Sequence, residues 1–189
     1  MKVAVLASGA GTNLQALLDT VHGREVEVVA VASDKPDAPA LERAASAAVE
    51  TRVFERGEYA DRAARDAAIA DWLESLAVEL VVLAGYMALL DAGFIARFRD
   101  RIVNVHPALL PAFPGVRAIE QAVDYGVRVF GVTVHLVDEG VDTGPIILQR
   151  SIEIADARDP EAVHDALRPI EHDLPCAAVR LLASGAVRR

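Results

Sequence analysis

Residues 101–117 read RIVNVHPALLPAFPGVR, and this stretch organises the rest of the chain. It predicts a buried strand first, because residues 102–105 are mostly apolar and β-branched. Asn104 and His106 stand two residues apart at the end of that strand and therefore point to the same face. Three prolines and a glycine follow almost at once, which exclude a helix and indicate a stiff loop.

A polar pair at the carboxyl end of a strand, just before a rigid loop, is where open α/β sheets carry their ligand sites. The same two residues also suit a capping Asn and a structural His beside a proline-rich turn. Asn104 and His106 alone do not separate these interpretations, so the decision rests on the rest of the sequence.

The chain of 189 residues suits one domain with a full-sized core. Apolar residues make up 53% and aromatic ones only 5%, which indicates the aliphatic core of a parallel sheet covered by helices. The net charge of −9 argues against nucleic acid as a partner, because phosphate contacts need clustered Lys and Arg. It also means that an anionic ligand has to be held by local groups.

Cys176 is the only cysteine, so an internal disulfide is excluded and a reducing compartment fits. The opening MKVAVLASGA resembles a clipped signal peptide, but its apolar run is too short for one. No stretch approaches the length of a membrane span. We therefore expect a cytoplasmic protein.

The apolar runs and helical periodicities predict a single Rossmann-like, three-layer α/β domain with about seven mostly parallel strands. The expected strands cover residues 2–7, 26–32, 51–54, 80–84, 102–106, 129–137 and 145–154. The expected helices cover residues 14–21, 38–49, 58–76, 91–98, 118–126 and 159–183, the last with a kink at Pro169 or Pro175. Close spacing suggests that the last two strands pair antiparallel.

The first strand runs into SGAGTN, residues 8–13, which we name the glycine turn. Gly9 and Gly11 permit a tight turn, and Thr12 or Asn13 can cap the helix that follows. Exposed amides at such a helix N-terminus bind anions. The turn lacks both the Lys of a Walker motif and the third glycine of a dinucleotide fingerprint. Glycine turns are common in α/β proteins, so this one is a weak signal by itself.

Other residues have two interpretations each. Asp34 stands where a dinucleotide-binding protein carries its ribose-binding acid, but we favour a simple turn residue. The helix expected over residues 58–76 carries Arg62 and Arg65, and its charges suit a solvated face. Tyr86–Met87 follow a strand, where such side chains either wall a flat ring or, more commonly, fill the core.

Asn104, His106 and Asp142 form a candidate catalytic set, with Asp142 in the loop DEGVDTGP. No serine stands on a nucleophile elbow, and His106 and His135 lack a third metal ligand at recognisable spacing. An amide, an imidazole and a carboxylate suit acyl transfer without a protein nucleophile. The Asn and a protonated His would hold an oxyanion, while the Asp orients the His, raises its pKa and relays a proton. By itself, Asp142 is more simply a turn carboxylate between glycines.

Over nearly its full length the chain resembles the phosphoribosylglycinamide formyltransferases, within the folate-dependent formyl-transferase family. The motifs that carry the resemblance are VLASGAGTNLQALLD, LVVLAGYM, IVNVHPALLPAFPG and GVTVHLVDEGVDTGPIILQ. The N-x-H-P-x-L-L-P run with a later D-x-G-P is highly specific to that family. The resemblance implies direct transfer of formyl from 10-formyltetrahydrofolate, a co-substrate, to the amine of glycinamide ribonucleotide in purine synthesis, with no metal.

The resemblance also implies which residues form the sites. Asn104, His106 and Asp142 fall on catalytic positions. The positions that match the ribonucleotide site are Gly11, Thr12, Asn13, Pro107, Arg168 and Glu171. The positions that match the folate site are Arg62, Met87, Leu90, Val137, Asp138, Glu139, Gly140, Val141 and Asp142. The resemblance further implies two halves, a ribonucleotide-phosphate half over about residues 1–100 and a catalytic, folate-binding half over about residues 101–189. It also implies small-molecule partners and allows a homodimer.

Three residues depart from the family pattern. Ala108 replaces a frequent serine, and we expect no effect. Arg117 replaces a usual histidine and adds a cation near the site, which we expect to help bind an anionic ligand. Ala88 stands where some members have an arginine near the glutamate tail of the folate, which leaves Arg62 as the candidate to hold that tail.

Other functions stay open. Formyltetrahydrofolate hydrolase and the catalytic half of methionyl-tRNA formyltransferase use the same donor, although each normally carries a further domain that we do not expect here. A non-catalytic, Rossmann-like nucleotide-binding module is supported only by the glycine turn and Asp34. Binding of a nicotinamide dinucleotide without any folate-dependent product would favour that module.

Overall fold

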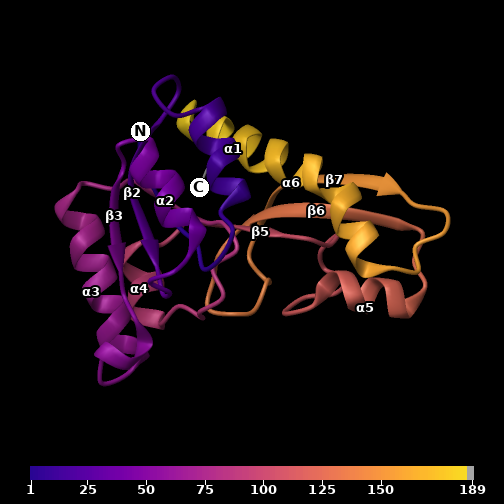
Figure 1. Ribbon diagram of the computed structural model, residues 1–189, viewed down its shortest axis with the longest axis horizontal. Coiled ribbons are helices and arrows are strands. Elements are labelled where there is room, and N and C mark those ends of the chain that lie inside the picture. Colours follow the sequence, from indigo (N-terminus) through magenta and orange to yellow (C-terminus); the bar gives the residue numbers. More distant parts are fainter. Residues whose placement is uncertain (187–189) are drawn as a thin grey trace.

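The apolar runs of the sequence form one sheet of seven strands in the order β3-β2-β1-β4-β5-β6-β7 (Figure 1). In this computed structural model, residues 1–186 are described. The strands are β1 (Lys2–Leu6), β2 (Glu27–Ser33), β3 (Glu50–Val53), β4 (Leu80–Leu83), β5 (Ile102–His106), β6 (Val129–Leu136) and β7 (Ile146–Glu153). Strands β1 to β5 are parallel, and β6 runs antiparallel to both β5 and β7. The predicted fold, with its late antiparallel strand, is confirmed.

Helices cover both faces of this sheet, which makes three layers (Figure 1). They are α1 (Thr12–Thr20), α2 (Pro39–Ser46), α3 (Arg62–Ser75), α4 (Ala92–Arg97), α5 (Ala118–Tyr125) and α6 (Pro160–Ala183), with a short 3-10 turn η1 (Arg56–Glu58). Helices α1, α2, α5 and α6 pack on one face, and α3 and α4 pack on the other. Helices therefore exclude water from both faces, which explains why the central strands are mostly apolar.

Two local predictions about helix ends were wrong. Helix α1 begins at Thr12, and its N-cap is Gly11 in the left-handed conformation, without any side-chain cap. Thr12 and Asn13 cannot cap it because they already belong to its first turn. Helix α3 begins only at Arg62, since Asp61 ends the preceding loop and accepts a hydrogen bond from the Ala64 amide at 2.8 Å.

The strand order places the ligand site. The chain moves outward from β1 to β2 and β3, then returns to lay β4 on the other side of β1. The loops that follow β1 and β4 therefore run in opposite directions from the carboxyl ends of these two neighbouring strands. Such a reversal of strand order, or switch point, leaves a crevice between the loops. The end of β5 lies beside it. None of the helices within residues 1–186 is long and apolar enough to cross a membrane.

Candidate active site

A cavity of about 670 Å³ opens at this switch point. One side is formed by the glycine turn and the start of α1. A second side is formed by residues 85–90, which we name the wall loop, and a third by residues 137–142. The end of β5, with Asn104 and His106, lies at the junction of these segments.

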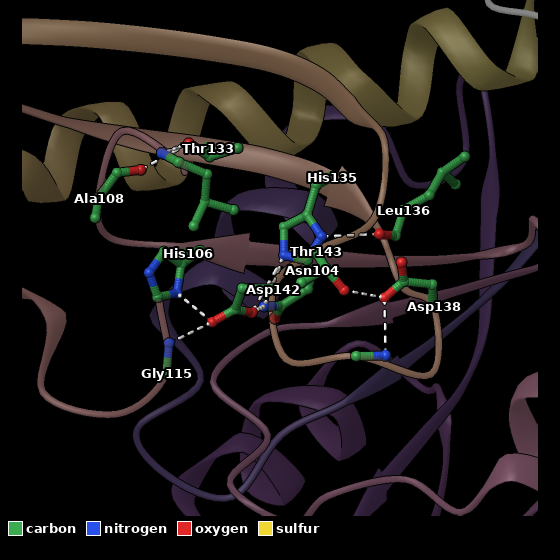
Figure 2. Close-up of polar contacts among 12 residues, drawn as sticks. Asn104, His106, Ala108, Gly115, Thr133, His135, Leu136, Asp138, Asp142 and Thr143 are labelled. Carbon is green, nitrogen blue, oxygen red and sulfur yellow. Dashed lines mark hydrogen bonds and ion pairs between the residues drawn. The ribbon is translucent and has the colours of Figure 1, made fainter. Parts of the chain in front are cut away.

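Asp142 is the centre of the polar contacts in this cavity (Figure 2). Its Oδ2 atom lies 3.3 Å from Nδ1 of His106 and accepts a hydrogen bond from the Gly115 amide at 2.8 Å. Its Oδ1 atom accepts a hydrogen bond from Nδ2 of Asn104 at 3.3 Å and lies 3.4 Å from Nε2 of His135. The structure thus brings together the three side chains proposed as catalytic, and adds a second histidine.

His135 is the residue that reasoning from the sequence missed. It lies opposite Asn104 because β6 pairs antiparallel with β5, and its Nε2 atom is 3.3 Å from Nδ2 of Asn104. The sequence carried one usable signal. His135 and Thr133 are two polar residues on the same face of an otherwise apolar strand. The close spacing of the late strands predicts pairing only with β7, so the neighbour of β6 on its other side was not identified.

The two imidazoles present one nitrogen each to Asp142. Nε2 of His106 lies 2.8 Å from the carbonyl oxygen of Phe113, so that nitrogen carries a proton and donates it. Nδ1 of His135 donates in the same way to the carbonyl of Leu136 at 2.8 Å. In both rings the remaining nitrogen faces the carboxylate (Figure 2). The backbone acceptors therefore fix which nitrogen can exchange a proton near Asp142.

The environment of Asp142 decides its charge. Burial opposes ionisation, but hydrogen bonds from His135 and the Gly115 amide, together with the charges of His106 and His135, outweigh it. The pKa of Asp142 falls to about 2. A carboxylate with so low a pKa is a weak base near neutral pH. It suits the task of orienting His106 better than that of removing a proton.

The segment of residues 137–142, which we name the acidic loop, holds Asp142 in an unusual backbone conformation. Asp142 has a φ of 54°, in the left-handed region that Asp tolerates better than most residues. Asp138 closes the turn before it, since its Oδ1 atom accepts hydrogen bonds from the Gly140 amide at 3.0 Å and the Thr143 hydroxyl at 2.7 Å (Figure 2). The structure therefore gives Asp138 a role in shaping the loop that carries Asp142.

The glycine turn offers its backbone to the cavity. The first amides of α1 have no acceptor within the helix. Gly11 has a φ of 70°, and a Cβ atom there would lie 2.7 Å from the Cα of Ala40 on α2. The side-chain oxygen of Asn13 is buried and has no hydrogen-bond partner within residues 1–186. A cation also lies at the turn, because Nε of Arg43 donates to the carbonyl of Ala10 at 2.8 Å, which the sequence did not indicate.

Asp34 joins this turn to the wall loop. The hydroxyl of Ser8 donates to Oδ1 of Asp34 at 2.5 Å and accepts a hydrogen bond from the Met87 amide at 2.9 Å. Asp34 is buried, and its other carboxylate oxygen lies 3.7 Å from Arg56. A carboxylate engaged in this way supports the structural role that we favoured over ribose binding.

Nearly every residue implied by the resemblance lines the cavity. The lining includes Gly11, Thr12, Asn13, Arg62, Met87, Leu90, Pro107, Glu171 and all of residues 137–142. Arg168 of α6 does not line it, and its guanidinium donates to Asp165 at 2.7 Å. His164 lines it instead, and its Nε2 atom lies 3.3 Å from Glu171. The binding and catalytic roles of all these residues stay predictions.

The three departures from the family pattern also have places. Arg117 lines the cavity in a left-handed conformation, with φ of 59°, and its side chain is 73% exposed. Ala88 lies in the wall loop. Ala108 is buried, and its carbonyl accepts a hydrogen bond from the Thr133 hydroxyl at 2.6 Å. That contact needs no serine side chain.

Comparison with known proteins identifies relatives of the chain. The formyl transferase family model matches residues 1–179. Phosphoribosylglycinamide formyltransferase of Haemophilus influenzae is 39% identical over 99% of this chain and 89% of its own length. The trifunctional purine biosynthetic protein adenosine-3 of Drosophila pseudoobscura is 42% identical over 100% of this chain, which spans only 14% of that protein. The crystal structure of glycinamide ribonucleotide transformylase 1 from Symbiobacterium toebii matches with a TM-score of 0.94 and 44% identity, over 98% of this chain and 88% of that one.

Proposed function

The chain belongs to the formyl transferase family, and we propose that it transfers the formyl group of 10-formyltetrahydrofolate to the amine of glycinamide ribonucleotide in purine biosynthesis. The observation that carries the proposal is the convergence of Asn104, His106 and Asp142 on the cavity that also contains the glycine turn. An amide, an imidazole and an ionised carboxylate suit acyl transfer, and an anion-binding turn beside them suits a phosphorylated acceptor.

In this proposal the acceptor phosphate binds the amides at the start of α1. Arg43 adds positive potential behind the turn, where the protein otherwise carries a net charge of −9. The unpaired Asn13 oxygen and the Glu171 carboxylate offer acceptors for ribose or amine hydrogens. Arg117 at the exposed rim adds a further cation for either anionic substrate.

The folate donor occupies the space between the wall loop and residues 137–142. Met87 and Leu90 supply apolar contact for its flat ring, and backbone groups of the acidic loop supply hydrogen bonds. Arg62 lies at the same cavity and is the candidate to hold the glutamate carboxylates. The carboxylate of Asp142 faces the reacting end of this space.

The reaction needs no protein nucleophile. The acceptor amine attacks the formyl carbon, and the carbonyl electrons move to oxygen to give a tetrahedral oxyanion. The bond from that carbon to N10 of the folate then breaks, and the proton lost by the amine passes to N10. Asn104 and a ring N–H of His106 donate hydrogen bonds to the oxyanion, while Asp142 orients His106. Both ring nitrogens of His106 have protein partners, Nε2 the Phe113 carbonyl and Nδ1 the Asp142 carboxylate. To donate to the oxyanion, His106 gives up one of these two contacts and binds the substrate oxygen in its place.

We further propose a cytoplasmic enzyme that acts on small molecules and not on nucleic acid, consistent with the net charge of −9. We also propose a ribonucleotide-phosphate half over about residues 1–100 and a catalytic, folate-binding half over about residues 101–189, with the wall loop contributing to the folate site from the first half.

A spectrophotometric assay of 10-formylfolate deformylation, with and without glycinamide ribonucleotide, tests the proposed function. We expect turnover only when the ribonucleotide is present, and one formylated ribonucleotide for each folate consumed. Equal turnover without it would identify a formyltetrahydrofolate hydrolase and reject the transferase. Absence of turnover in both mixtures, with nicotinamide dinucleotide bound at equilibrium, would support a non-catalytic nucleotide-binding module.

A further inference from the structure

The wall loop is an irregular segment that exposes two apolar side chains, while Tyr86 and Leu90 pack partly against the core and Ala88 is buried. Residues 85–90 form neither helix nor strand, yet they make one side of the cavity. Met87 is 62% exposed and Leu89 is 63% exposed, so the side chains offered to a ligand contribute little to fixing the backbone. A binding wall of this kind needs anchors beneath it, because a ligand that has to order a loop binds less tightly.

One anchor is a buried ion pair on α3 that the proposed mechanism does not use. Arg65 is 3% exposed and Asp66 is 0% exposed, although the helix pattern predicted a solvated face for such charges. Nε and Nη2 of Arg65 donate to Oδ1 of Asp66 at 2.8 Å and 2.6 Å. Burial raises the pKa of the Asp66 carboxyl, and the Arg65 guanidinium opposes that shift.

The remaining hydrogen bonds of this pair go to the far end of the wall loop. Nη2 of Arg65 donates to the carbonyl of Leu89 at 3.3 Å, and the amide of Asp91 donates to Oδ2 of Asp66 at 2.7 Å. The near end of the loop is held separately, by Ser8 at the Met87 amide. The only residue between these two anchored positions is Ala88, whose side chain is buried.

Stability alone does not explain a buried pair at this place. Burying two charges costs solvation energy that their attraction only partly repays, and well-packed apolar residues of similar volume are commonly as stable or more so. The side of α3 that packs on the sheet is otherwise apolar, with Ile69 and Leu73 fully buried. What apolar residues could not supply is a donor for the Leu89 carbonyl and an acceptor for the Asp91 amide.

We propose that Arg65 and Asp66 are positioning residues that hold the wall loop in the conformation that binds the formyl donor. The identity of that ligand as a folate rests on the proposed function. The pair touches neither substrate, and its contacts are at Leu89 and Asp91, while the end of the wall loop that adjoins the glycine turn keeps its own anchor at Ser8. Loss of the pair therefore weakens donor binding and leaves ribonucleotide binding unchanged.

The double variant Arg65→Met/Asp66→Asn tests this proposal. It removes both charges together and fills the space with a side chain of similar length. The new carboxamide at position 66 can still accept from the Asp91 amide, so we expect the thermal midpoint to stay close to that of the wild type. The donor KM should rise about tenfold, the scale of one lost hydrogen bond to a charged group. The KM for ribonucleotide and kcat should stay within about twofold.

Amide hydrogen exchange supplies a readout that needs no substrate. We expect peptides covering residues 85–91 to exchange about tenfold faster in the double variant, while peptides from β1 and α1 are unchanged. If the wild type lacks formyl transfer but this exchange still rises, the proposed function fails and the anchoring role survives. Unchanged exchange would overturn the anchoring role whatever the activity.

Two further variants complete the test. Arg97→Met is the matched control, because Arg97 links α4 to Asp71 and Glu74 of α3 at the surface, away from the wall loop, and it should leave the donor KM unchanged. Arg65→Lys keeps the charge but cannot span Asp66 and Leu89 as a guanidinium does, so it should raise the donor KM even if the double variant fails to fold. A stable double variant or Arg65→Lys variant with wild-type donor KM would overturn the proposal.

Discussion

Two aspartates of this protein lie in buried polar clusters, and their environments differ in an instructive way. Asp66 is sealed, with contacts of 2.6 to 2.8 Å to Arg65 and the Asp91 amide. Asp142 faces the cavity, and its contacts to three side chains measure 3.3 to 3.4 Å. Burial raises the pKa of the first, whereas hydrogen-bond donors and imidazoles lower that of the second to about 2. The short contacts of Asp66 are made with the Arg65 guanidinium and a backbone amide, and they hold the structure in place. The longer contacts of Asp142 are divided among three side chains, which leaves these side chains able to contact a substrate.

The largest effect that separates the clusters is on stability. Asp66→Ala leaves the Arg65 guanidinium buried without its partner, so we expect the free energy of unfolding to fall by about 3–5 kcal/mol. Urea unfolding measures this loss. Asp71→Ala, on the same helix but with a side chain that is 72% exposed, should cost less than about 1 kcal/mol. Similar losses in both variants would remove the distinction between scaffold and surface pairs.

Replacement of a histidine in the cavity cluster should affect rate more than stability. We expect His106→Ala to lower kcat by at least about a hundredfold, the usual scale for a general acid or an oxyanion donor. Steady-state kinetics with both substrates at saturation measure kcat, and circular dichroism checks the fold. A kcat within a few-fold of the wild type would show that His106 is structural.

The low pKa of Asp142 also predicts how stability depends on pH. Its folded pKa of about 2 lies below the ordinary value of 3.8, so its ionised form stabilises the fold above about pH 4, and that contribution disappears as the pH falls towards 2. The difference in unfolding free energy between wild type and Asp142→Asn should include roughly 2 kcal/mol at neutral pH that is lost in acid. A difference that is constant from pH 7 to pH 2 would contradict the lowered pKa.

The smallest predicted effect concerns the glycine turn. Gly11→Val introduces a Cβ atom 2.7 Å from Ala40 at a positive φ, so the first amides of α1 must shift. We expect the KM for ribonucleotide to rise about tenfold, the loss of one or two helix-end interactions, while the KM for the folate donor is unchanged. Gly23→Val is the control, because Gly23 has the same sign of φ and an open surrounding away from the cavity. Equal loss of both substrates would contradict two separate binding regions.

The sequence was informative where the chemistry is local. The strand that ends in Asn104 and His106, and the glycine turn after the first strand, were both recognisable from residue type and spacing. Asp142 was a candidate by residue type, but only the family resemblance favoured it over a simple turn carboxylate, since a carboxylate between glycines has no signature of its own. Contacts between residues on neighbouring strands were harder to predict. His135 was missed because the antiparallel pairing of β5 with β6 was not expected.

Buried charge was the other weak point. A helix pattern treats Arg as a solvent-facing residue, so Arg65 was assigned to a solvated face although it is 3% exposed. Its guanidinium donates to the carbonyl of Leu89, which lies 24 residues away and follows a different strand. Arg43 was missed for the same reason, because the carbonyl it contacts belongs to the glycine turn. Such long-range pairs follow from how the layers pack, which no local pattern contains.

The central claim is that the cavity cluster performs formyl transfer while the α3 pair only positions the loop beside it. A single-turnover measurement of formyl transfer by Asp142→Asn, with both substrates saturating, tests it most directly. We predict a rate at least about a hundredfold below the wild type, with unchanged binding of the ribonucleotide. A rate close to that of the wild type would contradict the claim.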